Sequence, residues 1–374
     1  MKHINTKTEI LFGDRFFKSE CLPQSGYDWR VHKKELSPYF EQHGFSVSMM
    51  YNDFYSRLSG IVSDRYISMD LYYFYIVPCL NRRQFSKAYA DKNMYSILFG
   101  GCNQPLTVIK NRNGIFFDDK ENIIDQNEAI ERCLSVAHDK IIKPTVDTGE
   151  GRGVALFQAR NKVDALEAFS RYKKDFIVQE KISNHSDLAR LNPTSCNSMR
   201  IMTYRALDGR IHHLRNKSFF RVGKDGAVMD NMGSGGGMCC VFDDGHVNDR
   251  VVHYNSMKVE SFEANYGVRN FVIPNFDQAL SFAERLHARL PYFDFVGWDI
   301  TIDQEGNPAL IEYNLPGETG SVQSGCGPMF VEDLDEIMMR LSSVRKQSAE
   351  VSMNVFQHGY EHLLQIKGDE YDFR

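Results

Sequence analysis

The stretch FVGWDITIDQEGNPALIEYNLPGE, residues 295–318, constrains the fold of this chain more than any other part of the sequence. It predicts two short strands joined by a turn, because polar and apolar residues alternate on both sides of a Gln-Glu-Gly-Asn segment. Asp299, Glu312 and Asn314 stand where strands usually bury aliphatic side chains. Since side chains two apart in a strand share a face, Glu312 and Asn314 point the same way.

The register of this hairpin decides whether Asp299 joins them. If residues 304–307 form a four-residue loop, Asp303 pairs with Pro308 and Asp299 lies opposite Glu312. A loop with an odd number of residues would turn Asp299 toward the aromatic side, which costs several kcal/mol for an unpaired carboxylate. The even loop segregates the two faces: one carries Asp299, Thr301, Glu312 and Asn314, and the other carries Trp298, Ile300, Ile311 and Tyr313.

Two opposed carboxylates repel each other, and a cation between them removes that penalty. Oxygen ligands of this kind suit Mg²⁺ or Mn²⁺. The hairpin therefore predicts a metal site formed by Asp299, Glu312 and Asn314. The alternative is a solvent-exposed sheet face with charged residues, which the Asn two residues after the Glu and the following Pro-Gly make less favourable.

A glycine-rich loop follows another apolar strand in KIIKPTVDTGEGRGV, which places Lys143 ahead of Gly149, Gly151 and Gly153. Backbone amides of such a loop can wrap phosphate oxygens, and a lysine at the strand end supplies a positive charge at a fixed place. The spacing matches neither the P-loop nor the dinucleotide-binding pattern. A solvent-exposed turn is the alternative interpretation.

Composition narrows the class of protein. The 374 residues are 42% hydrophobic and 25% charged with a net charge of −5, which is typical of a globular protein and gives no nucleic-acid-binding footprint. The apolar run at 71–80 is about half the ~20 residues of a membrane-spanning helix, and the first residues show no secretory signal. The eight cysteines are scattered without a CxxC pair, so we expect neither disulfides nor zinc, and a cytoplasmic location.

The order of predicted elements indicates an α+β fold with a helical front and a mostly antiparallel sheet behind it. Helices are expected at 33–43, 48–60, 84–99, 126–137, 162–173, 277–290 and 331–365. Strands are expected in a hairpin at 106–118 with an Asn-Gly turn, and at 140–144, 176–182, 200–207, 211–220 and 238–242.

Several segments in a fixed order carry a resemblance to a known family. Lys92 follows Asp91 on a helix, Lys143 precedes the glycine loop, VQEKI ends a strand, and EYN comes last. This series resembles the ATP-grasp superfamily, and NPTSCNSMRIMTYR, DNMGSGGGMCCVFD and GWDITID…ALIEYNLPGE resemble its sugar-transfer associated branch. The resemblance implies two α+β subdomains that grip ATP. It divides the chain into a mostly helical N-terminal region (1–84), an ATP-grasp domain (85–345) and a helical C-terminal tail (346–374).

The resemblance also implies roles for individual residues. The α and β phosphates of ATP would be held by Lys92 and Lys143, under a loop that contains Gly151 and Gly153. The adenine would meet Gln179, Glu180, Lys181 and Ile182, and the ribose would meet Asp187, with His185 as a competitor. Mg²⁺ would be bound by Asp299, Glu312 and Asn314. The γ-phosphate and an acylphosphate intermediate would be neutralised by Arg200, Lys217 and Arg221; Lys217 and Arg221 lie four apart and are expected to share an anionic partner.

The activity that this resemblance implies is that of an ATP-dependent carboxylate–amine ligase, which forms an amide through an acylphosphate and converts ATP to ADP. Its substrates would be a small carboxylate and an amine, such as a sugar acid or an amino acid, in polysaccharide assembly. One alternative is a small-molecule kinase with the same ATP site, and another is a nucleotide-binding protein without turnover. The Rossmann-like front of many ATP-grasp ligases is not recognisable here, so the resemblance does not transfer substrate selection.

Overall fold

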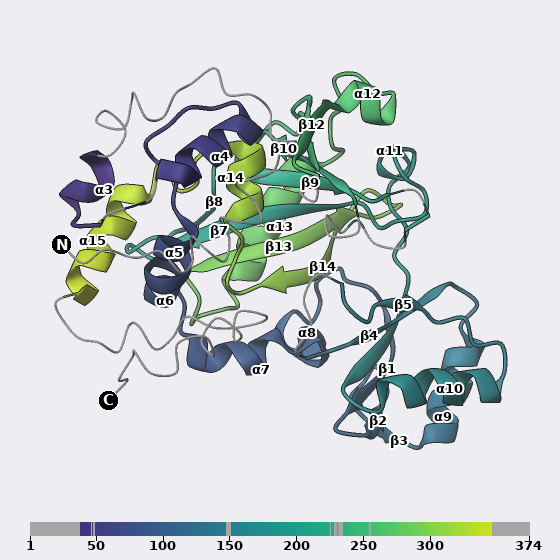
Figure 1. The fold of residues 1–374 in the computed structure, drawn as a ribbon. Helices are drawn as coiled ribbons and strands as arrows, with labels where there is room; N and C mark the ends of the chain where they lie inside the picture. Colours follow the sequence, from purple (N-terminus) through teal and green to yellow (C-terminus); the bar gives the residue numbers. More distant parts are fainter. Residues whose placement is uncertain are drawn as a thin grey trace.

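The computed structural model of the protein describes residues 38–345 except 46, 48, 147–150, 225, 228–229, 231–234 and 254–255. The predicted tail at 346–374 and the beginning of the helix predicted at 33–43 lie outside the described residues. Figure 1 shows a smaller sheet with two helices at lower right and a larger sheet at the centre, with further helices around it. The chain is thus α+β, as the sequence predicts. None of its described helices is long and apolar enough to cross a bilayer.

The smaller sheet has the strand order β3-β2-β1-β6-β4-β5, and its paired strands are antiparallel. The predicted Asn-Gly hairpin turn is confirmed, because Asn113 and Gly114 have φ of 50° and 90°. Two helices bury Ile130 and Phe169 against Phe176 of the sheet. The elements of this subdomain are β1 (Thr107–Arg112), β2 (Ile115–Phe117), β3 (Ile123–Ile124), α9 (Gln126–Ser135), β4 (Lys140–Pro144), β5 (Ala155–Leu156), α10 (Lys162–Tyr172) and β6 (Phe176–Glu180).

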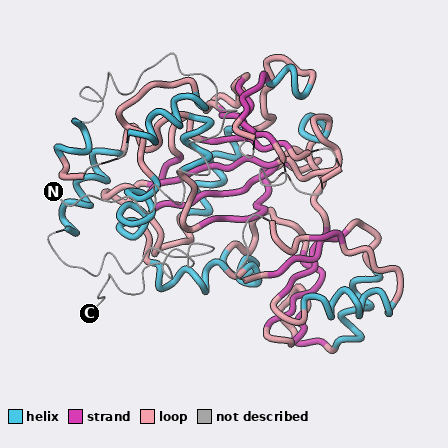
Figure 2. The backbone as a smooth tube through the Cα atoms, viewed as in Figure 1, coloured by secondary structure: helices cyan, strands magenta, loops and turns pink. Residues whose placement is uncertain are grey.

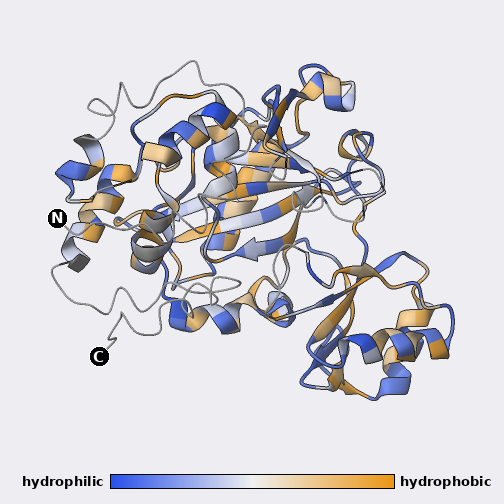
Figure 3. Cartoon of the chain, viewed as in Figure 1, coloured by the Kyte–Doolittle hydropathy of each residue, from blue (hydrophilic) through white to orange (hydrophobic). Residues whose placement is uncertain are grey.

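The larger sheet has the order β12-β11-β10-β9-β7-β13-β14, with β8 paired to β7. The single strand predicted at 211–220 is wrong: Asn216, with φ of 53°, separates β8 from β9. Hydrophilic residues lie within these strands as well as on the surface helices (Figure 3). The strands are β7 (Ser198–Arg205), β8 (Ile211–His213), β9 (Ser218–Val222), β10 (Gly237–Val241), β11 (Arg250–His253), β12 (Lys258–Ser261), β13 (Phe295–Ile302) and β14 (Pro308–Asn314).

One face of the larger sheet packs against α13 (Phe276–His287), whose buried residues join Trp298 in one core. His287 Nδ1 and Trp298 Nε1 both lie 2.7 Å from Thr203 Oγ1, and His287 Nε2 lies 2.8 Å from the Phe293 carbonyl oxygen. Burial lowers the pKa of His287 to about 3, so the imidazole is neutral. Two short helices, α11 (Ser186–Ala189) and α12 (Phe262–Tyr266), lie at the sheet margin.

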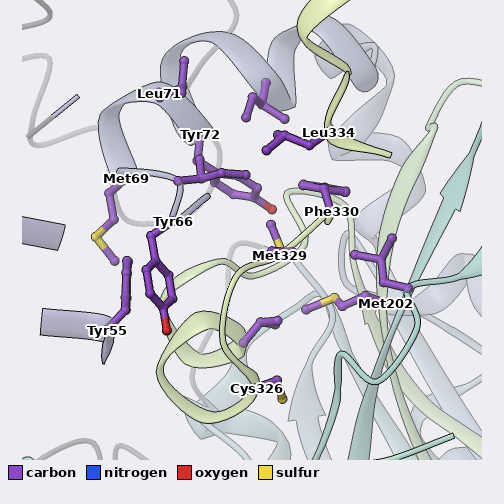
Figure 4. Packing of buried hydrophobic residues seen from close by; sticks show 14 of the residues in the cluster. Tyr55, Tyr66, Met69, Leu71, Tyr72, Met202, Cys326, Met329, Phe330 and Leu334 are labelled. Atoms are coloured by element: carbon purple, nitrogen blue, oxygen red, sulfur yellow. The ribbon is translucent and has the colours of Figure 1, made fainter. Parts of the chain in front are cut away.

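The opposite face is covered over part of its length by N-terminal helices and by helices that follow β14. Tyr55, Tyr66 and Tyr72 pack with Met202 and Cys326 in this second core (Figure 4). The described part of the N-terminal region, from residue 38 on, thus contains helices. The helices that cover this face of the larger sheet are α3 (Pro38–Gln42), α4 (Met49–Ser59), α5 (Met69–Leu71), the π-helix η1 (Tyr72–Ile76), α6 (Val77–Leu80), α14 (Gly320–Cys326) and α15 (Leu334–Arg345).

A chain of short helices leads from this cover to the smaller sheet (Figure 2). The single helix predicted at 84–99 is wrong, because Asp91 leaves the helical conformation with ψ of 118°. Its carboxylate accepts a hydrogen bond from the Asn93 amide at 2.9 Å and so caps a new turn that begins at Lys92. The pieces are η2 (Arg83–Phe85), α7 (Ser86–Ala90), η3 (Lys92–Met94) and α8 (Tyr95–Leu98).

Candidate active site

The β13–β14 hairpin places Asp299 opposite Glu312 and Trp298 opposite Tyr313, which confirms the predicted register at these positions. The turn itself differs from the prediction. Ile302, not Asp303, pairs with Pro308, so the loop at 303–307 has an odd number of residues. The register shifts between the Ile300–Leu310 pair and the Asp299–Glu312 pair, which leaves one extra residue on β14. This β-bulge compensates for the odd loop and keeps Asp299 on the face of Glu312.

Arg200 on β7 is the direct neighbour of Asp299, so a row of charged side chains crosses three strands from Arg200 through Asp299 to Glu312. The Arg200 guanidinium binds both Asp299 oxygens, through Nε to Oδ1 and through Nη2 to Oδ2 at 2.9 Å. Arg221 Nη2 lies 3.3 Å from the same Oδ2. Burial opposes the charged form of Asp299, but the two guanidiniums outweigh it and hold the pKa of that carboxyl below its usual value.

Arg221 on β9 is held by a second carboxylate, that of Asp230. Its Nε lies 3.5 Å from Asp230 Oδ2, and its Nη2 donates to Ser198 Oγ at 2.6 Å. Burial disfavours the charged guanidinium, but Asp230 and Asp299 raise the pKa of Arg221 above its ordinary value. Asp230 is not among the site residues predicted from the sequence. Its only sequence signal is its place at the start of the DNMGSGGGM motif.

Two buried asparagines of the NPTSCNSMRIMTYR motif anchor the beginning of β7. Asn197 Nδ2 donates to the carbonyl oxygens of Leu188 and Asn192, at 2.8 and 3.0 Å. Asn192 Nδ2 donates to the Gly223 carbonyl, at the end of β9, at 2.7 Å. Both asparagines are completely buried, so these bonds are shielded from water. The motif thereby fixes the strand that carries Arg200.

Two lysines approach the same carboxylates from the side of the smaller sheet. Lys92 Nζ lies 3.0 Å from Glu312 Oε1, and the Lys92 amide donates to the Thr145 carbonyl at the end of β4. Lys143 lies on β4 itself. Burial, followed by the positive charge of Lys92, lowers the pKa of Lys143 to about 8, while Glu312 acts in the opposite direction. Lys92, Lys143 and Glu312 therefore form one electrostatic group between the two sheets.

The glycine loop returns toward β4. Gly151 and Gly153 have φ of 69° and 77°, a backbone conformation that favours glycine. A Cβ at Gly153 would also lie 2.8 Å from the ring of Pro144. Gly149 lies outside the described residues.

The residues expected at the adenine and ribose lie at and beyond the end of β6. The Gln179 side chain is buried and donates toward Thr107 Oγ1 at 3.4 Å, so its amide faces β1. The Lys181 ammonium lies 3.3 Å from the Thr194 carbonyl. Glu180 ends β6 and Ile182 is half-buried beyond it. Asp187 lies on α11, with its carboxylate 3.6 Å from His185 Nδ1 and 3.8 Å from Arg190 Nη1.

Lys217 does not belong to this group of charges. It precedes β9, and its Nζ donates to the Cys326 carbonyl at the end of α14, at 2.7 Å. Arg221 instead contacts Asp230 and Asp299. The prediction that Lys217 and Arg221 share an anionic partner is therefore wrong, because the lysine compensates the carbonyl end of a helix.

The donor atoms of the hairpin determine which residues could hold a metal ion. Glu312 and Asn314 lie two apart on β14, so these two oxygen-bearing side chains share a strand face. Asn314 Nδ2, which is a donor and not a metal ligand, is buried without a hydrogen-bond partner among the described residues. Both Asp299 oxygens already contact guanidiniums. The described residues contain no group of three or more His, Cys, Asp or Glu side chains arranged to hold a metal. Glu312 and Asn314 thus fit Mg²⁺, whereas Asp299 would have to give up an arginine contact.

The charges in the site do not cancel. The four cations Lys92, Lys143, Arg200 and Arg221 face the three anions Asp230, Asp299 and Glu312 when Lys143 is protonated. A partly buried excess of positive charge favours an anionic ligand. A separate cavity of about 600 Å³ lies beside the turn of the β13–β14 hairpin and α13, and none of these seven residues lines it.

A family model described as sugar-transfer associated ATP-grasp matches residues 75–327. Among solved structures, the chain is similar to the D-alanine-D-alanine ligase from Coxiella burnetii, with 10% identity, a TM-score of 0.41, and coverage of 77% of this chain and 64% of that one. It is also similar to the ATP-grasp ligase PsnB in complex with a minimal precursor, with 13% identity, a TM-score of 0.41, and coverage of 70% of this chain and 64% of that one. A third similar structure is an ADP complex of purK, N5-carboxyaminoimidazole ribonucleotide synthetase, with 11% identity, a TM-score of 0.37, and coverage of 64% of this chain and 47% of that one.

This chain spans about half to two thirds of the length of these three proteins. The comparison with curated proteins gives no match.

Proposed function

Because the chain belongs to the sugar-transfer associated ATP-grasp family, we propose that it is an ATP-dependent ligase that joins a carboxylate to an amine. The observation that carries this proposal is the group of charges between the two sheets. Lys143 approaches it from β4 of the smaller sheet and Lys92 from η3, whereas Arg200 and Arg221 lie on the larger sheet. Glu312 contacts Lys92 at 3.0 Å. A polyphosphate in this place would meet positive charge on two sides.

Each charged residue then has a defined task. Lys92 and Lys143 bind the α and β phosphates, and Lys92 exchanges its contact with Glu312 for one with phosphate. Arg200 and Arg221 face the γ-phosphate and stabilise negative charge during its transfer. Glu312 and Asn314 are the ligands for Mg²⁺, which when bound would neutralise phosphate charge and orient the phosphate oxygens. The adenine and ribose roles of Gln179, Glu180, Lys181, Ile182 and Asp187 remain part of the proposal, although the Gln179 side chain faces β1.

The reaction proceeds in two steps. A carboxylate oxygen of the first substrate attacks the γ-phosphorus of ATP, the bond to the β-phosphate oxygen breaks, and ADP leaves. The amine of the second substrate then attacks the acyl carbon, a C–N bond forms, the C–O bond to phosphate breaks, and the amine gives up a proton. The protein positions the reactants and stabilises charge, and it needs no covalent nucleophile of its own.

The substrate class follows from the family description alone. A family associated with sugar transfer supports a sugar acid or a sugar-linked amine as one of the two substrates, in polysaccharide modification. The scattered cysteines without a CxxC pair support a reducing, cytoplasmic setting.

The test is a screen for ADP release from ATP over uronic acids, sugar nucleotides and amino acids, supplied singly and in pairs. We expect ADP, not AMP, only when a carboxylate is present, and a hydroxamate when hydroxylamine replaces the amine. Phosphate transfer to a hydroxyl without any hydroxamate would show a kinase instead. Absence of Mg·ATP binding in calorimetry would exclude both enzymes.

A further inference from the structure

Asp230 is a buried carboxylate that the proposed reaction does not yet use. It is 7% exposed and lies outside the strands, between β9 and β10. Its Oδ2 accepts hydrogen bonds from the Ser198 amide at 2.8 Å and from the Ser198 hydroxyl at 2.5 Å. The same atom lies 3.5 Å from Arg221 Nε. Asp230 therefore ties the beginning of β7 to the arginine of the neighbouring strand.

These contacts continue into a chain of alternating charge. Asp230 contacts Arg221, Arg221 contacts Asp299, and Asp299 is bound by Arg200. Ser198 closes the first link, because its hydroxyl oxygen lies 2.6 Å from Arg221 Nη2. The Nε edge of Arg221 thus faces Asp230, and its Nη2 atom lies between Ser198 and Asp299. Arg221 Nε makes no hydrogen bond among the described residues. Asp230 is therefore its ion-pair partner at 3.5 Å, while the hydrogen bond from Nη2 goes to the Ser198 hydroxyl oxygen.

We propose that Asp230 is a positioning residue that holds the Arg221 guanidinium in the orientation in which it meets the γ-phosphate. The inference rests on the proposed function, since it assumes that ATP binds with its γ-phosphate at the two arginines. Asp299 alone leaves this orientation open, because Arg200 already binds both of its oxygens. Asp230 acts on Arg221 in two ways: its charge attracts the Nε edge, and it accepts the Ser198 hydroxyl hydrogen, which leaves the Ser198 oxygen to accept from Nη2.

A purely structural counter-charge would behave differently. If Asp230 only compensated a buried cation, its loss would lower stability but would affect ADP and ATP binding alike. A positioning role instead acts on the ligand that carries a γ-phosphate. The ratio of the affinities for Mg·AMPPNP and Mg·ADP separates the two roles without knowledge of the acceptor substrates.

The experiment is calorimetry of both nucleotides on the full-length wild type and on Asp230→Asn, which keeps an oxygen for the Ser198 donors but removes the charge. We expect Mg·AMPPNP to bind about tenfold more weakly to the variant, as for the loss of a charge-assisted contact, and Mg·ADP to bind within about threefold of wild type. Asp119→Asn is the matched control, because that carboxylate is half exposed in the smaller subdomain.

Combination with Arg221→Lys provides the second readout. If Asp230 acts through Arg221, the double variant should lose no more Mg·AMPPNP affinity than Arg221→Lys alone. Additive losses of affinity, or an unchanged ratio of the Mg·AMPPNP and Mg·ADP affinities in Asp230→Asn, would overturn the inference about Asp230. In that case, Mg·ADP binding by the wild type would still leave the proposed function standing. A wild type that binds neither nucleotide overturns both. If Asp230→Asn does not fold, Asp230→Glu replaces it: an intermediate ratio supports the positioning role, and a wild-type ratio refutes it.

Discussion

Nucleotide binding should raise the pKa of Lys143 and take up a proton. In the unliganded protein, burial and the charge of Lys92 lower that pKa from 10.5 to about 8. The phosphates of a bound nucleotide would return it to about its ordinary value, because a close anion favours the charged ammonium. Lys143 is then about half neutral at pH 8 before binding and almost fully protonated after it.

The magnitude follows from these two pKa values. We expect uptake of about 0.5 proton per nucleotide at pH 8 and about 0.1 at pH 7, and an affinity for Mg·ADP about tenfold weaker at pH 9 than at pH 7. By the same linkage, the Lys143 contribution makes the unliganded protein more stable as the pH rises from about 8 to 10.5, because only the unfolded chain still holds that proton there.

Calorimetry of Mg·ADP binding at pH 8, in two buffers with different ionisation enthalpies, measures the proton uptake directly. Lys143→Arg is the control, since a guanidinium stays charged over this range and should abolish the uptake. The reasoning is refuted if wild type takes up less than about 0.1 proton at pH 8, or if the Lys143→Arg protein takes up as much as wild type.

Three further predictions concern the metal ligands, the core and the turn after β14. Glu312→Gln should weaken Mg²⁺-dependent nucleotide binding about tenfold or more, whereas Glu305→Gln, in the exposed turn of the hairpin, should not. If calorimetry shows the same Mg²⁺ dependence of nucleotide binding for both variants, the metal role of Glu312 is contradicted. Thr203→Val should cost about 2–4 kcal/mol of unfolding free energy, because its hydroxyl serves both the buried imidazole and the indole N–H; a loss below about 1 kcal/mol in urea unfolding would argue against that network. Gly317→Ala should destabilise by about 3 kcal/mol or more, since a Cβ would lie 2.1 Å from a Phe295 ring carbon. Gly267→Ala is the control, because Gly267 has a similar φ of 68° and a Cβ there would have no atom within 4 Å; it should cost only about 1 kcal/mol of unfolding free energy. Similar melting temperatures for the two variants would show that the contact at Gly317 is relieved.

The candidate site could be predicted best where the arrangement of side chains depends on a single strand. The period of two places Glu312 and Asn314 on one face whatever the rest of the chain does. The position of Lys143 near the end of a strand follows similarly from the short segment KIIKP, and β4 has the predicted bounds of 140–144. Local propensity also predicts the Asn113-Gly114 turn, because both residues tolerate positive φ.

Long-range contacts set the features that could not be predicted from the sequence. The odd loop at 303–307 should have turned Asp299 away, and a bulge on the partner strand corrected the register. Lys217 is four residues from Arg221, but α14 folds over its end of β9 and offers a carbonyl oxygen instead of a phosphate. Asp230 gave no sequence signal of its own role, because its partners Ser198 and Arg221 lie 32 and 9 positions away along the chain.

The sequence by itself determined which residue types stand on which strand faces, since alternation along a strand is a property of the local backbone. Only the tertiary structure decided which charges meet. Asp299 was predicted to contact a metal, and in the folded chain two guanidiniums from β7 and β9 reach it. The physical reason is that the free energy of a buried carboxylate depends on whichever cation the neighbouring strands bring to it, and strand order across a sheet is not encoded within any single strand.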